Sequence, residues 1–123
     1  MKKKILIYLM MIIGIMLIIG GTYMDSESKK EYRDYILEQL DLLDNITSRP
    51  MMGEYLLYYK GLLFGGIYDN RLLVKIVDSN NKYNMPESIP YEGAKPMYLI
   101  EDVDNKEILK DIVIDTFNDL QKK

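Results

Sequence analysis

The stretch that decides the fold is MGEYLLYYKGLLFGGIYDNRLLVKIV, residues 52–77. It contains three runs rich in aromatic and aliphatic residues, predicted as strands over Met52 to Tyr59, Leu62 to Tyr68 and Arg71 to Val77. The pairs Lys60-Gly61 and Asp69-Asn70 separate the runs and are typical of two-residue turns. Because connections this short join only antiparallel neighbours, the middle of the chain is predicted to be a β-meander.

Two adjacent glycines interrupt the second of these strands. Gly65-Gly66 predicts a β-bulge or a close approach of another backbone. Because no dinucleotide-type spacing surrounds the pair, a phosphate-binding loop is not predicted.

A helix is predicted before the meander. Ser28-Lys29-Lys30-Glu31 has the form of a capping box, in which a hydroxyl and a carboxylate accept from backbone N–H groups at a helix start. The helix is predicted to end near Asn45, well before Pro50. Apolar residues recur along it at steps of three and four: Tyr32, Tyr35, Ile36, Leu40 and Leu43.

The chain after the meander is predicted to form a loop, a strand and a second helix. Residues 78–96 are polar and proline-rich, which favours a long loop with one helical turn near Ser79 to Tyr83. Met97 to Ile100 is predicted as a fourth strand, and Asp104-Asn105-Lys106-Glu107 as the cap of the helix that follows. The predicted fold class is α+β: a two-layer antiparallel sheet with flanking helices, in the order helix, β-meander, loop, strand, helix, preceded by a hydrophobic N-terminal helix.

The predicted domain covers residues 25–123, and residues 1–24 form a separate hydrophobic segment. Lys2-Lys3-Lys4 precedes a long run without formal charge, and the segment from Ile5 to Tyr23 has the length and composition of a transmembrane helix. This interpretation predicts a single-pass membrane protein with a cytoplasmic N-terminus. In the other interpretation translation starts at Met24, because back-translation of Gly20 to Met24 can contain a ribosome-binding sequence, and the domain is then cytoplasmic.

Composition excludes several kinds of chemistry. The 123 residues include no Cys and no His, so there is no thiolate nucleophile, no Cys-ligated zinc and no imidazole base. We therefore expect no enzymatic activity, no metal and no cofactor. From residue 24 onward 13 basic residues face 19 acidic ones, a balance of −6, so we also expect no direct binding of nucleic acid.

Three groups of polar or aromatic residues are candidate sites. Arg49, Arg71, Lys75 and Lys95 can converge on an anion or interaction surface; the alternative is that they pair with Glu54, Asp69 and Glu92. The cluster Tyr55, Tyr58, Tyr59 and Tyr68 can line a ligand groove or belong to the core and its rim. The acidic run 101–107 lacks the glycine and final glutamate of an EF-hand loop and is better explained as a helix start.

Two stretches of the sequence carry a resemblance to a known family. They are residues 46–75, ITSRPMMGEYLLYYKGLLFGGIYDNRLLVK, and residues 90–97, PYEGAKPM. The motifs are an Arg-x-Met-Gly-like entry to the first strand, a Tyr-x-x-Gly-x-x-Phe hairpin, an Arg-Leu-x-x-Lys third strand and a Lys-Pro-Met entry to the last. In these motifs, from about Ser28 to Leu120, the chain resembles the TfoX N-terminal domain family. The resemblance implies a small two-layer fold and a cytoplasmic protein. Full-length members of the family are regulators of competence for DNA uptake that work with transcription machinery such as the cyclic-AMP receptor protein, and they carry a second, C-terminal domain. This chain resembles the short single-domain members.

Two functional hypotheses remain open. The first is a non-enzymatic regulatory module that binds a protein, with transcription machinery as the partner implied by the resemblance, and with a membrane anchor if Met1 is the true start. The second is a small-ligand-binding or enzymatic domain that uses a Tyr-rich groove with Arg and Lys residues.

Overall fold

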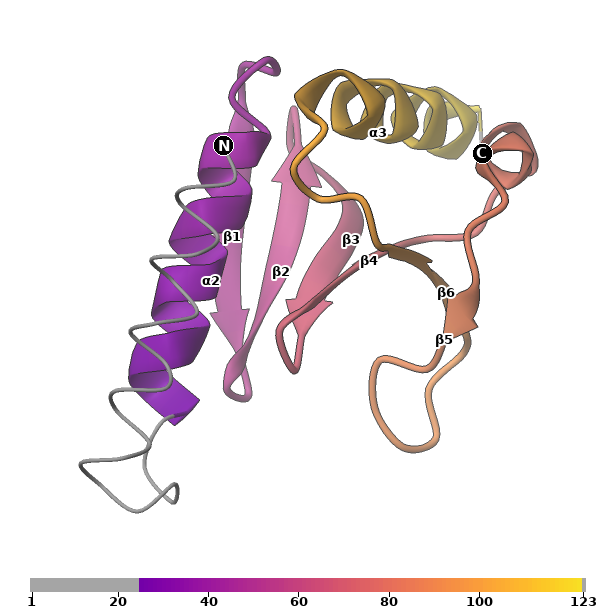
Figure 1. The fold of residues 1–123 in the computed structure, drawn as a ribbon. Helices are drawn as coiled ribbons and strands as arrows, with labels where there is room; N and C mark the ends of the chain where they lie inside the picture. Colours follow the sequence, from indigo (N-terminus) through magenta and orange to yellow (C-terminus); the bar gives the residue numbers. More distant parts are fainter. Residues whose placement is uncertain (1–24, 123) are drawn as a thin grey trace.

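The computed structural model of the protein describes residues 25–122 (Figure 1). The elements are α2 (Asp25–Gln39), β1 (Ile46–Met51), β2 (Glu54–Tyr59), β3 (Leu62–Tyr68), β4 (Arg71–Val74), the 3-10 helix η1 (Asp78–Tyr83), β5 (Glu87–Ser88), β6 (Met97–Ile100) and α3 (Lys106–Gln121). The predicted α+β class is confirmed. Among the described residues no helix is long and apolar enough to cross a membrane, and the predicted span from Ile5 to Tyr23 lies outside them.

The sheet has six strands in the order β1-β2-β3-β4-β6-β5, and all neighbours are antiparallel. β2, β3 and β4 form the predicted meander, and β1 extends it by one strand at the edge of the sheet. Each of its two-residue turns has positive φ at both central residues, as in type I′ turns: Met52-Gly53, Lys60-Gly61 and Asp69-Asn70. Turns of this type match the twist of the strands they join, so they fix the register of the meander.

β1, which contains Pro50, was not predicted from the sequence. Lys60 N donates to Asn45 O at 3.0 Å, and residues of an antiparallel strand alternate between hydrogen-bonded and non-hydrogen-bonded positions. Counting in twos from Asn45 places Thr47 and Arg49 at hydrogen-bonded positions and Pro50 between such positions. The missing N–H of Pro50 therefore faces the open edge of the sheet and removes no bond to β2. β5, a strand of two residues that pairs with β6, was also missed.

The predicted irregularity at Gly65-Gly66 is confirmed. The register between β2 and β3 shifts at Leu57/Tyr58, opposite this part of β3. A Cβ at Gly65 would collide with the Leu73 carbonyl oxygen, and one at Gly66 would lie 2.7 Å from the Tyr55 carbonyl oxygen. Only a residue without a side chain fits at either position.

The predicted bounds of the first helix are wrong at both ends. α2 already includes the residues before Ser28, whose side chain is inside the helix and only 1% exposed, so Ser28 does not cap the start. The helix ends at Gln39 instead of near Asn45. The chain then tightens into turns in which the N–H groups of Asp41 and Leu43 bond three residues back, as from Leu43 N to Leu40 O at 3.1 Å.

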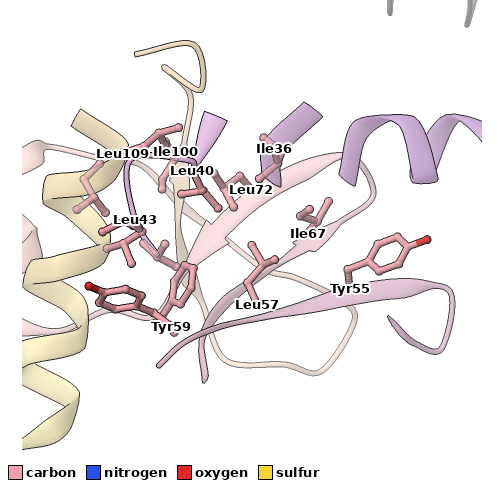
Figure 2. Packing of buried hydrophobic residues seen from close by; sticks show 14 of the residues in the cluster. Ile36, Leu40, Leu43, Tyr55, Leu57, Tyr59, Ile67, Leu72, Ile100 and Leu109 are labelled. Atoms are coloured by element: carbon pink, nitrogen blue, oxygen red, sulfur yellow. The ribbon is translucent and has the colours of Figure 1, made fainter. Parts of the chain in front are cut away.

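One hydrophobic core lies between the sheet and both helices. Figure 2 shows Ile36 of α2 and Leu40, in the turn directly after α2, directed toward Leu57 and Ile67 of the sheet. These residues are nearly or fully buried. α3 contributes side chains to the same core: Leu109, Ile112, Val113 and Phe117. The two helices therefore cover one face of the sheet, which gives the two predicted layers.

η1 is the predicted helical turn, and it docks on α3 near the C-terminal end of the helix (Figure 1). Ser79 N donates to Asp119 Oδ2 at 2.8 Å, and Tyr83 OH donates to Asp115 Oδ2 at 2.5 Å. Asn80 is fully buried at this contact. α3 itself begins where predicted, with the Asn105 side chain accepting from the backbone N–H in the first turn.

Candidate functional site

A groove of about 720 Å³ opens on the sheet face that the helices leave uncovered. Leu72 and Val74 of β4 point into the core, whereas Leu73 between them lies outside the core cluster. Because side chains alternate along a strand, Lys75 points to the same face as Leu73. We call this cavity the sheet groove, and its apolar lining includes Leu63, Tyr68, Ile76, Tyr91, Pro96 and Met97.

The segment between β5 and β6 forms one wall of the sheet groove. In Figure 1 this loop projects from the end of the sheet that lies away from α3. Gly93 has φ of 87°, and Ala94 N donates to Tyr91 O at 3.0 Å, which closes a tight turn. Leu99 N donates to Pro86 O at 2.8 Å where the loop returns to the sheet. The loop is therefore folded back on itself and held at its base.

Arg71, the first residue of β4, ties this loop to the sheet. Its Nε donates to Tyr68 O at 3.1 Å. One terminal nitrogen donates to Ser88 Oγ at 2.5 Å and to Ile89 O at 3.1 Å, and the other donates to Pro90 O at 3.2 Å. A guanidinium can make these contacts together because its five N–H donors have fixed directions. Arg71 therefore sets the position of the groove wall.

Tyr68 forms part of the floor of the sheet groove. Its ring lies close over Gly66, whose missing side chain leaves the space, and it is only 6% exposed. The ring of Tyr91 lies 6.1 Å away, tilted by 51°. Burial raises the pKa of the Tyr68 phenol, and the neighbouring Tyr91 and Glu54 raise it further. Tyr68 is therefore a neutral phenol at physiological pH.

The structure separates the four basic residues predicted as one surface. Lys75 and Lys95 line the sheet groove together. Arg71 lies beside the groove and is used in fixing its wall, as described above. Arg49 is in β1, at the opposite edge of the sheet from β5 and β6. Two of the four residues thus share one site.

The alternative ion pairs predicted for these residues can also be placed. The Glu54 carboxylate lies 3.4 Å from Lys29 Nζ on α2, and its other oxygen accepts from Asp69 N at 3.0 Å. Glu54 therefore joins α2 to the turn between β3 and β4 instead of pairing with the sheet arginines.

The tyrosine cluster divides between the two faces of the sheet. Tyr55 and Tyr59 lie in the core with the helices, where the Tyr59 ring meets Phe117 edge-on at 4.9 Å. Tyr68 lines the groove on the other face. The core-and-rim interpretation therefore holds for Tyr55 and Tyr59, and the groove interpretation holds for Tyr68.

The sequence-based candidates did not include several residues of the groove, among them Ile76, Glu87 and Tyr91. The signal that could have found Tyr91 is apolarity in a polar region. Tyr91 and its neighbour Ile89 are large aromatic or apolar residues beside prolines of the loop, and both are exposed in the structure. Such residues in a loop indicate a contact surface more often than a core.

The acidic run 101–107 lies at the start of α3. The pKa of Asp102 is raised, first because its carboxyl shares a hydrogen bond with Asp104 and then because of desolvation. Asn105 caps the helix, and Lys106 pairs with Asp41 at 3.0 Å. Within the described part of the chain no three acidic side chains are grouped as metal ligands.

Comparison with known proteins identifies the family. The model of the TfoX N-terminal domain matches residues 38–102, which include the whole sheet and all the residues of the sheet groove. A relative from Spirochaeta aurantia, described as an uncharacterized 12.7 kDa protein in the trpE 5′ region, is 31% identical over 74 residues. That match covers 58% of this chain and 64% of the relative, so the chain spans less than two thirds of the length of the relative. The chain belongs to the TfoX N-terminal domain family.

Proposed function

We propose that this domain is a non-enzymatic regulatory module that binds a protein partner through the sheet groove. The observation that carries the proposal is the set of exposed apolar side chains in and beside the groove: Ile76, Ile89 and Tyr91. Exposed apolar groups clustered on one face are typical of interaction sites. The regulatory role is supported by the family to which the domain belongs. Transcription machinery is the partner that we propose.

The construction of the groove also favours binding over catalysis. Its charged groups are two ammonium groups and one carboxylate, from Lys75, Lys95 and Glu87, around a mainly apolar surface. The wall is held in place by Arg71, so the surface is formed before a partner arrives. A preformed surface loses less conformational entropy on binding.

Photocrosslinking tests the proposal whatever the identity of the partner. A benzoylphenylalanine replaces Ile89, which is 54% exposed beside the groove, or Leu42, which is 45% exposed in the turns after α2. In cells that express the full chain at its natural level, irradiation is expected to give a discrete protein adduct from position 89. Position 42 is the matched control. Adducts of the same pattern from both positions, or none from position 89, would show that the groove is not a protein-binding site.

When translation begins at Met1, we further propose that residues 5–23 hold the module at the membrane, with the N-terminus in the cytoplasm and the domain on the other side. Transcription machinery is then the proposed partner only of a chain that begins at Met24. The support is the apolar run behind three lysines. Mass spectrometry of the N-terminus of the native protein tests it. A native chain that begins at Met24 would instead place the domain in the cytoplasm.

The second candidate function is binding of a small ligand, which the size of the groove favours. Sites for small molecules have volumes of about 300–1,000 Å³ and mainly apolar walls with a few polar groups. The sheet groove, at about 720 Å³, is within that range. A thermal-shift screen against metabolites tests this function, because a ligand that binds only the folded state raises the melting temperature.

A further inference from the structure

We propose that the sheet groove selects an acidic partner segment, one in which aspartate or glutamate residues alternate with large apolar residues. Lys75 and Lys95 would pair with the carboxylates while the apolar side chains of the segment pack against Tyr68 and Tyr91. This inference rests on the proposed function, because it names the chemistry of the protein segment that occupies the groove.

The charge of the sheet groove is opposite in sign to the charge of the domain. The chain from residue 24 onward has a balance of −6, with 13 basic and 19 acidic residues. The groove reverses this balance, because two lysines and one glutamate line it. The negative domain repels acidic segments everywhere except at its positive site. Charge therefore directs an acidic segment to the groove.

Both groove lysines are available to a charged partner. Among the described side chains of residues 27–122, no carboxylate forms an ion pair with Lys75 or Lys95. In contrast, Lys82 pairs with Asp115 at 3.1 Å and Lys106 pairs with Asp41 at 3.0 Å. The ammonium groups of the groove can therefore pair with a ligand without breaking an internal ion pair.

Hydrogen bonds hold the backbone of Lys75 in place. Lys75 N donates to Phe64 O at 2.9 Å, and Lys75 O accepts from the amide of buried Asn80 at 2.8 Å. The side chain therefore starts from a fixed point at the end of β4 and is partly buried along the groove. A fixed starting point lowers the entropy that is lost when the ammonium group pairs with a carboxylate.

The sheet groove also offers apolar surface to a partner. Tyr68 provides a buried floor, whereas Ile76 and Tyr91 are exposed at 40% and 57%. Apolar side chains of a partner can cover the exposed groups and so contribute affinity. The charges then determine which apolar segments are accepted, because an ion pair at a surface contributes more to specificity than to affinity.

The test uses two blocked hexapeptides that differ only in charge. One alternates aspartate with leucine and phenylalanine, and the other has lysine in place of each aspartate. Binding to the full chain is measured by isothermal titration calorimetry. We expect the dissociation constant of the lysine peptide to be about tenfold higher, equivalent to about 1.4 kcal/mol. The reason is that contacts with Lys75 and Lys95 change from attraction to repulsion.

Variants assign the preference to the groove. In the double variant Lys75→Gln with Lys95→Gln, we expect the two peptides to bind within about threefold of each other, because the attraction and the repulsion are both removed. Lys122→Gln is the control, since it makes the same chemical change at an exposed residue near the end of α3. If the double variant does not fold, Lys95→Gln alone, at an exposed residue, is expected to reduce the preference.

Each other outcome has a definite meaning. Equal affinity of the two peptides for the natural chain, or an equal effect of the control variant, overturns the inference. If position 89 still gives a crosslinked protein, the proposed function survives and only the acidic preference is wrong. If neither a crosslink nor peptide binding occurs, both are wrong. Binding of 4-phenylbutyrate as tight as that of the aspartate peptide would identify a site for small organic anions and also overturns the inference.

Discussion

Replacement of Asn80 by alanine is expected to destabilise the protein strongly, although Asn80 lies in a polar segment. The side chain is fully buried between η1 and α3. Its Oδ1 accepts from Val77 N at 3.2 Å, and its Nδ2 donates to Lys75 O at 2.8 Å and to Thr116 Oγ1 at 2.9 Å. Asn80→Ala removes these hydrogen bonds and leaves the groups that bonded to the Asn80 side chain without that partner. At about 0.5–1.5 kcal/mol for each bond, the expected loss is about 3 kcal/mol.

Urea unfolding followed by circular dichroism measures this loss. With a urea dependence of about 1–3 kcal/mol per M, the midpoint is expected to fall by about 1–3 M. The matched control is Asn81→Ala, because Asn81 is the next residue of η1 and its side chain is exposed. Its midpoint should change little, as is usual for exposed positions. Equal midpoints for the two variants would refute the reasoning that Asn80 joins the end of β4 to α3.

A second substitution distinguishes hydrogen bonding from shape. Asn80→Asp keeps an acceptor for Val77 N–H but loses both donors, and it places a carboxyl group in a fully buried position. Burial disfavours the ionised form. We therefore expect the variant to be less destabilised, relative to the natural chain, at pH 4 than at pH 7. If the difference in unfolding free energy between the variant and the natural chain were the same at both pH values, the burial of the site would be contradicted.

Other predictions concern the core, the tyrosines and nucleic acid. Phe117→Ala removes a buried ring packed against Tyr59 and should lower the free energy of unfolding by about 3–5 kcal/mol in a urea melt. Asn118→Ala, at an exposed residue, is the control and should change it by at most about 0.5 kcal/mol. Equal midpoints would mean that α3 does not dock by this face. Burial raises the pKa of Tyr32 to about 12 from 10.0. The stability that the neutral phenol gives the folded state is therefore fully present below pH 10 and is lost as the pH rises toward 12. Alkaline unfolding should therefore shift to higher pH in Tyr32→Phe, and an unchanged curve would contradict this role. Duplex DNA should show no measurable binding at physiological salt, and micromolar affinity with a steep salt dependence would contradict the charge argument.

The part of the fold that could be predicted from the sequence is the part with local signals. The meander was predicted because short apolar runs and turn pairs such as Lys60-Gly61 lie within a few residues of each other. β1 was missed because Pro50 and exposed polar residues remove the alternating pattern, and only the position of Pro50 at the open edge explains why a strand is tolerated there. Ser28 was misassigned because a capping-box pattern cannot show that the helix starts earlier.

The candidate site shows the same limit. Lys75 and Lys95 could be named from sequence as cations of the sheet region, but their common cavity depends on a loop between them. The position of that loop depends on bonds from Arg71 to carbonyl groups 18 and 19 residues away. Backbone carbonyls carry no sequence signal, so these bonds could not be predicted. Asn80 was equally hidden, because a polar residue in a polar segment gives no sign of burial.

The three tight turns of the meander have a consequence for the order of folding. Pairing within the meander joins nearby residues, as Ile46 with Tyr59, whereas β4 meets β6 through more distant residues, as Leu72 with Ile100. The entropy lost on closing a loop grows with its length, so we expect the hairpins to close first and β6, β5 and their loop to join last. The sheet groove is bounded by these late elements, and it is therefore completed only in the final step. Fluctuations that release the β5–β6 end would open the groove while the helix-packed core stays intact.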